Sequence, residues 1–434
     1  MNEVFMTGSE ILVACEKVST QAEVTGISRR YNSLQFGPEN SIPGAGERTG
    51  WGLRMTRNGK LGVSGEWGII NPFRLVDKTI SSCRYGPETL FDFPAEPHES
   101  AVPVANDLEA ITHESVHDYL DTLQNKIKEI HPLANLSARI QWGEDSFAIL
   151  NSCGLRGSYS KAVVSSSFSV TIPTDNGLLQ SGYFLKTTDS LPVMSLVLDM
   201  IVLPDHPKGL ISTGIAGRKN VVFSPVAFSM LLQAIRTGIS GKLLAEGASP
   251  LADMEGKQVL AKSLTIRDLP HLSSCAASVP FDSEGVPTQD KTLFEGGIFN
   301  GFLHDLRSAA QCNAVSTGSS GRNLGEHSRP VCTNLTVDPS MDVSTNTLAE
   351  TGSGILVTSI LSAGGGNAAS GSFTFDCGRT YVFRRGEIQG FYHGCVLSGN
   401  VYDVLSKVNT LGSIQYRVGT DLLPFISLND ISVR

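Results

Sequence analysis

The segment from Pro280 to Gln289 holds a high density of side chains that could do chemistry. Asp282 and Glu284 are two positions apart, so in an extended chain both carboxylates would point to one face. Gly285 and Pro287 then interrupt strand pairing, which predicts a shaped loop at the edge of a sheet. Such carboxylates can orient a peptide or a partner loop, or they can satisfy nearby backbone amides, and the composition favours neither role. The polar candidates are Asp282, Glu284, Thr288 and Gln289.

A second candidate is the segment from His113 to His117, which reads His-Glu-Ser-Val-His and matches the H-E-x-x-H pattern. In that pattern two histidines one helical turn apart bind zinc, and the glutamate, here Glu114, acts as general base. The apolar stripe of the expected helix, however, places both histidines on its polar flank, and no third ligand follows at a recognisable spacing. A solvated helix start is therefore the favoured interpretation. The stripe consists of Val116, Leu123 and Ile127.

The remaining reactive side chains give weaker signals. His304 lies in a Leu-His-Asp turn, where a structural histidine is favoured over a polar contact at a cleft. None of the 8 cysteines lies at the spacing of a zinc ribbon or a redox pair, so we expect buried thiols in a reducing compartment. Cys377 and Cys395 lie on expected strands and are interpreted in the same way. No Ser/His/Asp set and no phosphate-binding loop is evident.

Composition and sequence patterns predict that an α+β fold positions these residues. The chain has 434 residues, enough for two or three domains, and its 44 glycines favour a turn-rich, sheet-heavy fold. Residues 1–95 are expected to form an α+β domain with a hairpin that turns at Asn58-Gly59. Residues 96–216 are expected to form a middle region of helix plus sheet, and residues 217–434 a mostly β domain.

Hydrophobic spacing predicts the main elements more closely. Apolar residues at intervals of three and four predict a helix from Asn106 to Ile130, and a second helix is expected from Pro225 to Thr237. Alternating stretches predict several strands between these two helices. The expected strands cover residues 138–142 and 147–151, and a longer pair covers 162–172 with 178–185.

Composition also excludes some classes of function. The net charge of −8 argues against binding of nucleic acid. The best apolar run, from Leu191 to Leu203, is too short to span a bilayer and contains Asp199. The first residues lack the features of a secretory signal. We therefore expect a soluble cytoplasmic protein that does not bind a membrane.

The segment from Pro280 to Gln289 resembles the D-x-E-G-x-P-T-Q signature of the TldD/PmbA family. Members of this family resemble halves of a zinc-dependent, peptide-cleaving heterodimer. Further segments resemble other family motifs over most of the chain, although each is weak alone. They are Gly50 to Gly62, Asn151 to Gly154, Arg329 to Asn334, Phe383 to Ile388 and Leu397 to Asn400.

The resemblance also implies where zinc ligands would lie in a catalytic member. Such members carry His-Glu-x-x-x-His on a helix shortly before the signature, and the matching place here is the segment from Val221 to Gly238. Aligned on Leu231-Leu232, the two histidine positions are Gln233 and Gly238, and the glutamate position is Ala234. These three residues offer one weak amide ligand at most. The cysteine ligand that such members carry near the C-terminus has no counterpart in residues 411–424.

The resemblance therefore implies a PmbA/TldE-type subunit with no metal or catalytic residues of its own. Zinc is expected in a TldD-like partner, while this chain would complete the chamber and help to hold a peptide or unfolded protein. Two alternatives stay open: a stand-alone or homodimeric peptide-binding protein, and a zinc protease using His113, Glu114 and His117. The residues expected to face the peptide or the partner are Asp282, Glu284, Gly285, Thr288, Gln289, His304 and Asn334.

Overall fold

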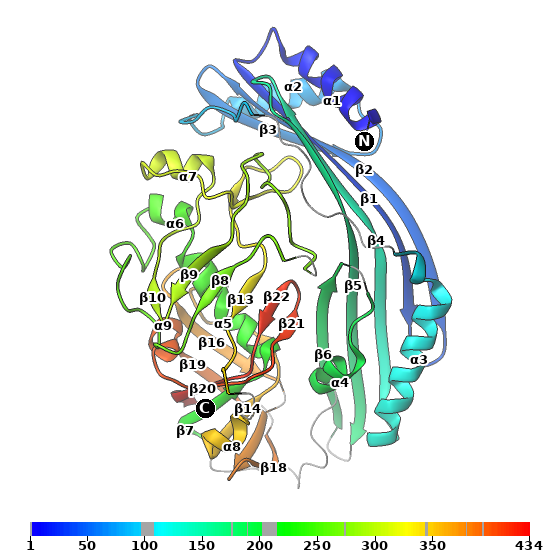
Figure 1. Ribbon diagram of the computed structural model, residues 1–434, viewed down its shortest axis with the longest axis vertical. Helices are drawn as coiled ribbons and strands as arrows, with labels where there is room; N and C mark the ends of the chain where they lie inside the picture. The colour runs from blue at the N-terminus through cyan, green and yellow to red at the C-terminus, as the bar shows by residue number, and fades with distance from the viewer. Residues whose placement is uncertain are drawn as a thin grey trace.

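The computed structural model describes residues 2–434 except 97–107, 175–176, 189, 202–214, 273–274, 343–345, 379 and 393–394. Its architecture is α+β, as the sequence predicts. A long, curved sheet from the N-terminal half stands beside a more compact, mostly β C-terminal half (Figure 1). Within the described residues, no helix is long and apolar enough to cross a membrane.

The long sheet contains six antiparallel strands among the described residues. They are β1 (Gln21–Phe36), β2 (Ser41–Arg57), β3 (Lys60–Trp67), β4 (Asn135–Asn151), β5 (Arg156–Thr174) and β6 (Gly177–Thr187). Their order is β3-β2-β1-β4-β5-β6, so strands on both sides of residue 95 share one sheet. The predicted hairpin is confirmed, because Asn58 and Gly59 have φ values of 51° and 72°, as a type I′ turn requires.

Two predictions for this region are wrong in detail. Residues 138–142 and 147–151 are one continuous strand, β4, because Gly143 to Ser146 pair with β1 on one side and β5 on the other instead of forming a turn. The helix expected from Asn106 begins instead at His113, since the Thr112 side chain caps it by accepting a hydrogen bond from the Ser115 amide. Residues 106–107 lie outside the described residues.

Helices cover one face of the long sheet and the ends of the molecule (Figure 1). The hydrophobic core of the lower half of this sheet contains Val116, Leu120 and Leu123 from the capped helix and Trp142 from β4. The helices of the N-terminal half are α1 (Asn2–Cys15), α2 (Pro72–Cys83), η1 (Leu108–Ala110), α3 (His113–Ile130) and α4 (Met194–Ile201).

In the C-terminal half, the described residues form a nine-stranded sheet, a second six-stranded sheet and a two-stranded ribbon. The strands are β7 (Gly217–Phe223), β8 (Ile266–Asp268), β9 (Lys291–Glu295), β10 (Ile298–Phe299), β11 (Ser320–Gly321), β12 (Arg329–Pro330), β13 (Leu335–Val337), β14 (Ser353–Val357), β15 (Ile360–Ser362), β16 (Ser372–Cys377), β17 (Thr380–Arg384), β18 (Glu387–Tyr392), β19 (Val396–Asn400), β20 (Val408–Leu411), β21 (Tyr416–Val418), β22 (Asp421–Leu423) and β23 (Ile426–Val433). The helices are α5 (Pro225–Gly238), α6 (Gly241–Ala245), α7 (Leu306–Gln311), α8 (Thr347–Thr351) and α9 (Val401–Leu405).

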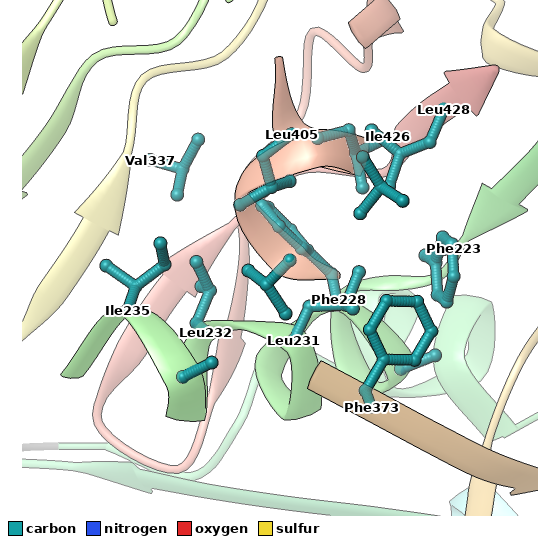
Figure 2. Packing of buried hydrophobic residues seen from close by; sticks show 14 of the residues in the cluster. Phe223, Phe228, Leu231, Leu232, Ile235, Val337, Phe373, Leu405, Ile426 and Leu428 are labelled. Carbon is teal, nitrogen blue, oxygen red and sulfur yellow. The ribbon is translucent and has the colours of Figure 1, made fainter. Parts of the chain in front are cut away.

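The predicted helix from Pro225 is confirmed as α5, which begins after the N-cap Ser224. Its apolar side packs into the largest cluster of buried side chains. Figure 2 shows Leu231, Leu232 and Ile235 of α5 beside Leu405 of α9 and Ile426 of β23. The helix on which the family resemblance places zinc ligands is therefore fixed in the core of the C-terminal half.

Candidate functional site

The signature segment adopts a tight turn rather than an extended strand. Both Asp282 oxygens accept hydrogen bonds from backbone amides: Oδ1 from Glu284 (2.8 Å) and Val286 (3.0 Å), and Oδ2 from Ser320 (2.9 Å). Gly285 supports the turn with a φ of +78°. The expectation that the two carboxylates share one face is therefore wrong, because the chain folds around Asp282 and directs Glu284 elsewhere.

Glu284 reaches a network of buried charges that includes the N-terminal sheet. Arg54 of β2 donates to Glu284 Oε1 through Nη1 and to Glu23 Oε2 through Nη2 at 3.0 Å, and all three side chains are at most 1% exposed. Ser328 donates to Glu284 Oε1 at 2.7 Å, and the Leu306 amide donates to Oε2 at 2.8 Å. The carboxylate is thus fully enclosed by donors.

The ion pairs of this network shift the pKa values of Arg54 and Glu284. Burial alone would lower the pKa of Arg54, but the carboxylates of Glu23 and Glu284 raise it above the usual value. Burial opposes ionisation of Glu284, yet Arg54 and the other donors hold the pKa of Glu284 below its usual value. Arg322 pairs with the second oxygen of Glu23. Ion pairs among these four side chains therefore connect the long sheet to the signature loop.

The other predicted site residues are mostly buried around this loop. Thr288 donates to Val279 O at 2.5 Å, and Asn334 Nδ2 donates to Leu269 O at 2.7 Å. His304 lies 3.3 Å from Ser308 Oγ, and burial lowers the pKa of its ring. Gln289 is exposed. Asp282 and Thr288 also line a cavity next to this loop, and their contact with a peptide there stays a prediction. The Glu284 side chain, in contrast, is fully buried.

The H-E-x-x-H segment forms the first turn of α3, and its rings pack on aromatic side chains of the long sheet. The His113 ring lies 5.0 Å from the Trp142 ring, and the His117 ring lies 5.9 Å from the Phe36 ring. Glu114 is exposed. Throughout the described part of the chain, no group of three or more His, Cys, Asp or Glu side chains could hold a metal ion.

The positions on α5 that correspond to zinc ligands do not fit zinc. Gln233 is exposed, Ala234 is buried, and the hydroxyl of Tyr402 donates to Ala234 O at 3.4 Å. A β-carbon built on Gly238 would lie 2.0 Å from the same hydroxyl, so a larger side chain would have to displace Tyr402. Shifting the alignment by one residue either way gives Leu-Gln-Thr or Ala-Ile-Ile at the three positions, sets that contain no histidine, cysteine or carboxylate.

A cavity of about 330 Å³ lies between the long sheet and the signature loop. Phe147, Tyr159 and Phe281 form an aromatic wall, with ring centroids 5.3–6.2 Å apart. Lys161 of β5 also lines the cavity. Burial and the charge of Glu284 raise the pKa of Asp282 to about 7, while its three backbone donors act in the opposite direction.

Sequence reasoning missed Arg54, Glu23, Arg322 and Lys161. For Arg54 a signal exists: it is a charged residue between Leu53 and Met55 in a strand buried on both faces, a position that requires a partner. No comparable signal marks the lysine, because its strand is rich in serine and polar on one face.

Comparison with known proteins agrees with this description. Residues 216–434, just over half of the chain, match the model of the PmbA/TldA metallopeptidase C-terminal domain. A metalloprotease PmbA homolog from Haemophilus influenzae is 34% identical over 188 residues, which cover 43% of this chain and 40% of that protein. A metalloprotease TldD homolog from Buchnera aphidicola is 27% identical over 42% of this chain and 38% of that protein. The chain thus matches about two fifths of the length of these relatives.

The fold similarity extends further than the sequence similarity. The crystal structure of TldE from Thermococcus kodakarensis superposes with a TM-score of 0.86 at 17% identity, covering 98% of this chain and 99% of that one. At this level of identity the superposition shows a shared fold. The domain match, which covers more than half of the chain, establishes that the chain belongs to the PmbA/TldD family.

Proposed function

We propose that this chain is the metal-free subunit of a two-chain metallopeptidase, in which a TldD-like subunit holds the zinc ion. The observation that carries the proposal is the structure of α5. Gln233, Ala234 and Gly238 replace the expected ligand set, and Tyr402 occupies the space beside Gly238. Zinc sites in proteins use histidine, cysteine or carboxylate ligands, which this helix lacks.

In this proposal the chain contributes shape and backbone hydrogen bonds rather than catalytic groups. The buried network around Arg54 fixes the long sheet against the signature loop, and the cavity between them opens to solvent. An unfolded peptide held there would lie extended, as in other cases where a peptide adds to a sheet. The partner's zinc would supply the activated water.

The thiols support a cytoplasmic location for this complex. All eight cysteines lie among the described residues, and all are free. Burial raises the pKa of Cys332 to about 12 and that of Cys15 to about 11, so both thiols stay protonated and unreactive at neutral pH. Such thiols suit a reducing compartment.

Co-expression with a TldD-like subunit that carries His-Glu-x-x-x-His tests the proposal. We expect the two chains to co-purify and cleave an unfolded protein such as casein, whereas this chain alone cleaves nothing. The matched control is a partner in which the motif glutamate is replaced by glutamine, which should assemble but lose activity. A homodimer that never captures the partner would instead support a stand-alone binding protein and contradict the proposal.

A further inference from the structure

One cation in the lining of the cavity beside the signature loop, Lys161, lies opposite Asp145 of β4, whose carboxylate pairs with Arg29. Lys161 Nζ donates to Ser278 O at 3.3 Å and lies 5.9 Å from the centre of the Tyr159 ring. Among the described residues Lys161 takes part in no ion pair, and its ammonium group keeps donors free. A partly buried ammonium of this kind favours an anionic ligand.

The other charges that line the cavity already have partners. Arg29 pairs with Asp145 at 3.6 Å, and Arg322 pairs with Glu23. The Asp282 carboxylate accepts three backbone hydrogen bonds, which disperse any negative charge. Lys161 is therefore the group in this lining that can bind a single negative charge without breaking an existing ion pair.

The rest of the cavity suits an apolar group next to that charge. The rings of Phe147 and Tyr159 are stacked at 5.4 Å, and Phe281 meets Tyr159 edge to face at 5.3 Å. Tyr159 therefore contributes its ring to the cavity lining. The volume of about 330 Å³ falls at the lower end of the range of small-ligand sites.

We propose that this cavity binds the C-terminal residue of a peptide, with the terminal carboxylate on the Lys161 ammonium and an apolar side chain against Phe147, Tyr159 and Phe281. The inference rests on the proposed function, because it specifies how the metal-free subunit would hold its peptide. A terminal carboxylate carries one charge on a main chain, so the adjacent amide N–H can donate to Ser278 O while the carboxylate accepts from Lys161.

Calorimetric titration of the purified chain, without zinc or partner, tests this proposal directly. The probes are acetyl-Ala-Ala-Ala-Phe as the free acid, the same peptide as the C-terminal amide, and acetyl-Ala-Ala-Phe-Glu amide. We expect the free acid to bind about tenfold more tightly than either amide, the gain typical of one charge-assisted hydrogen bond. Equal affinities for acid and amide, or no binding of the acid, would overturn the proposal.

Variants then locate the site. Lys161→Met removes the charge at similar length and should abolish the preference for the free acid, while Lys161→Arg should retain most of it. Lys126→Met is the matched control, because it removes the same charge from an exposed position on α3 that does not line the cavity. A preference for the acid that survives in Lys161→Met would place the anion elsewhere and refute the assignment.

The two proposals can fail separately. If the chain binds the free acid but never assembles with a TldD-like subunit, the proposed function fails and the peptide site stands. If the two chains form an active protease but acid and amide bind equally, the peptide site fails and the proposed function stands.

Discussion

Arg54 and Glu284, 230 residues apart in the chain, form an ion pair from which solvent is excluded. One residue comes from a strand of the long sheet and the other from the signature loop of the C-terminal half. Glu23 and Ser328 bond further atoms of this pair, so its charges are compensated, although Arg54 Nε has no hydrogen-bond partner among the described residues. The signature glutamate therefore acts first as a structural connection between the two halves.

Replacing Glu284 by glutamine should destabilise the protein strongly. The substitution leaves Arg54 buried with one carboxylate fewer, and breaking a buried pair in this way costs about 3–5 kcal/mol. Urea denaturation measures the change in the free energy of unfolding. Glu47→Gln is the control, because its pair with Arg30 is exposed to solvent and should contribute little to stability. Similar losses in both variants would contradict the role of the network.

Tyr402 and Gly238 should be energetically coupled. In Gly238→Ala the new β-carbon would lie 2.0 Å from the Tyr402 hydroxyl, so the ring must shift, at a cost of about 1–3 kcal/mol. Tyr402→Phe removes the clashing oxygen, so the same alanine should cost less in that background. A double-mutant cycle from denaturation curves measures this coupling. Additive effects of the two substitutions would show that the tyrosine does not occupy the space beside position 238.

Burial of the Lys161 ammonium group should destabilise the folded protein less as the pH rises above 8. Burial lowers the pKa of Lys161 to about 8, against an opposing effect of Asp145, while Lys186 and Arg29 lower it further. Between pH 8 and the ordinary lysine pKa of about 10.4, the unfolded state binds one more proton than the folded state, so the free energy of unfolding rises with pH. The cost of burying the charge is thus fully present below pH 8 and is lost progressively between pH 8 and about 10.4.

A comparison of the free energies of unfolding of the wild-type protein and Lys161→Met should reveal this effect. The free energy of unfolding of the wild type minus that of the variant should rise between pH 8 and pH 10, by on the order of 1–3 kcal/mol. Because other lysines, tyrosines and thiols titrate equally in both proteins, the difference isolates Lys161. A flat or falling difference would show that the amine is not desolvated.

Glu114 should not affect proteolysis. In the structure it is exposed on the first turn of α3, and the flanking histidines pack on Trp142 and Phe36. Glu114→Gln should therefore leave kcat/KM of the co-purified complex within about twofold of the wild type. A loss of about a hundredfold or more, the range expected for a general base, would instead assign catalysis to the H-E-x-x-H segment.

Sequence reasoning predicted those parts of the fold that depend on local physics. The turn at Asn58-Gly59 follows from backbone preferences, and the boundaries of α5 follow from its cap and its apolar spacing. The pairing of Arg54 with Glu284 could not be predicted, because nothing local relates two residues so far apart. The fold around Asp282 was also missed, since periodicity assumes an extended chain where side-chain hydrogen bonds impose a turn.

In the candidate site, too, only the features that depend on local residue types could be predicted. The absence of ligands at 233, 234 and 238 can be deduced from residue types alone, whereas the position of Tyr402 against them requires the packing of α9 on α5. The cavity is built from strands β1, β4 and β5, from the signature loop and from residues 318–322 and 331–333, which are distant in sequence. Its aromatic wall and Lys161 could be recognised only once these segments were assembled.

Elemental analysis tests the central claim most directly. Zinc should be measured by mass spectrometry in this chain purified alone and in the complex with a TldD-like subunit, both after dialysis against a metal-free buffer. We expect no stoichiometric zinc in the chain alone and about one zinc ion per complex. About one zinc ion bound to the isolated chain would contradict the proposal that this subunit is metal-free.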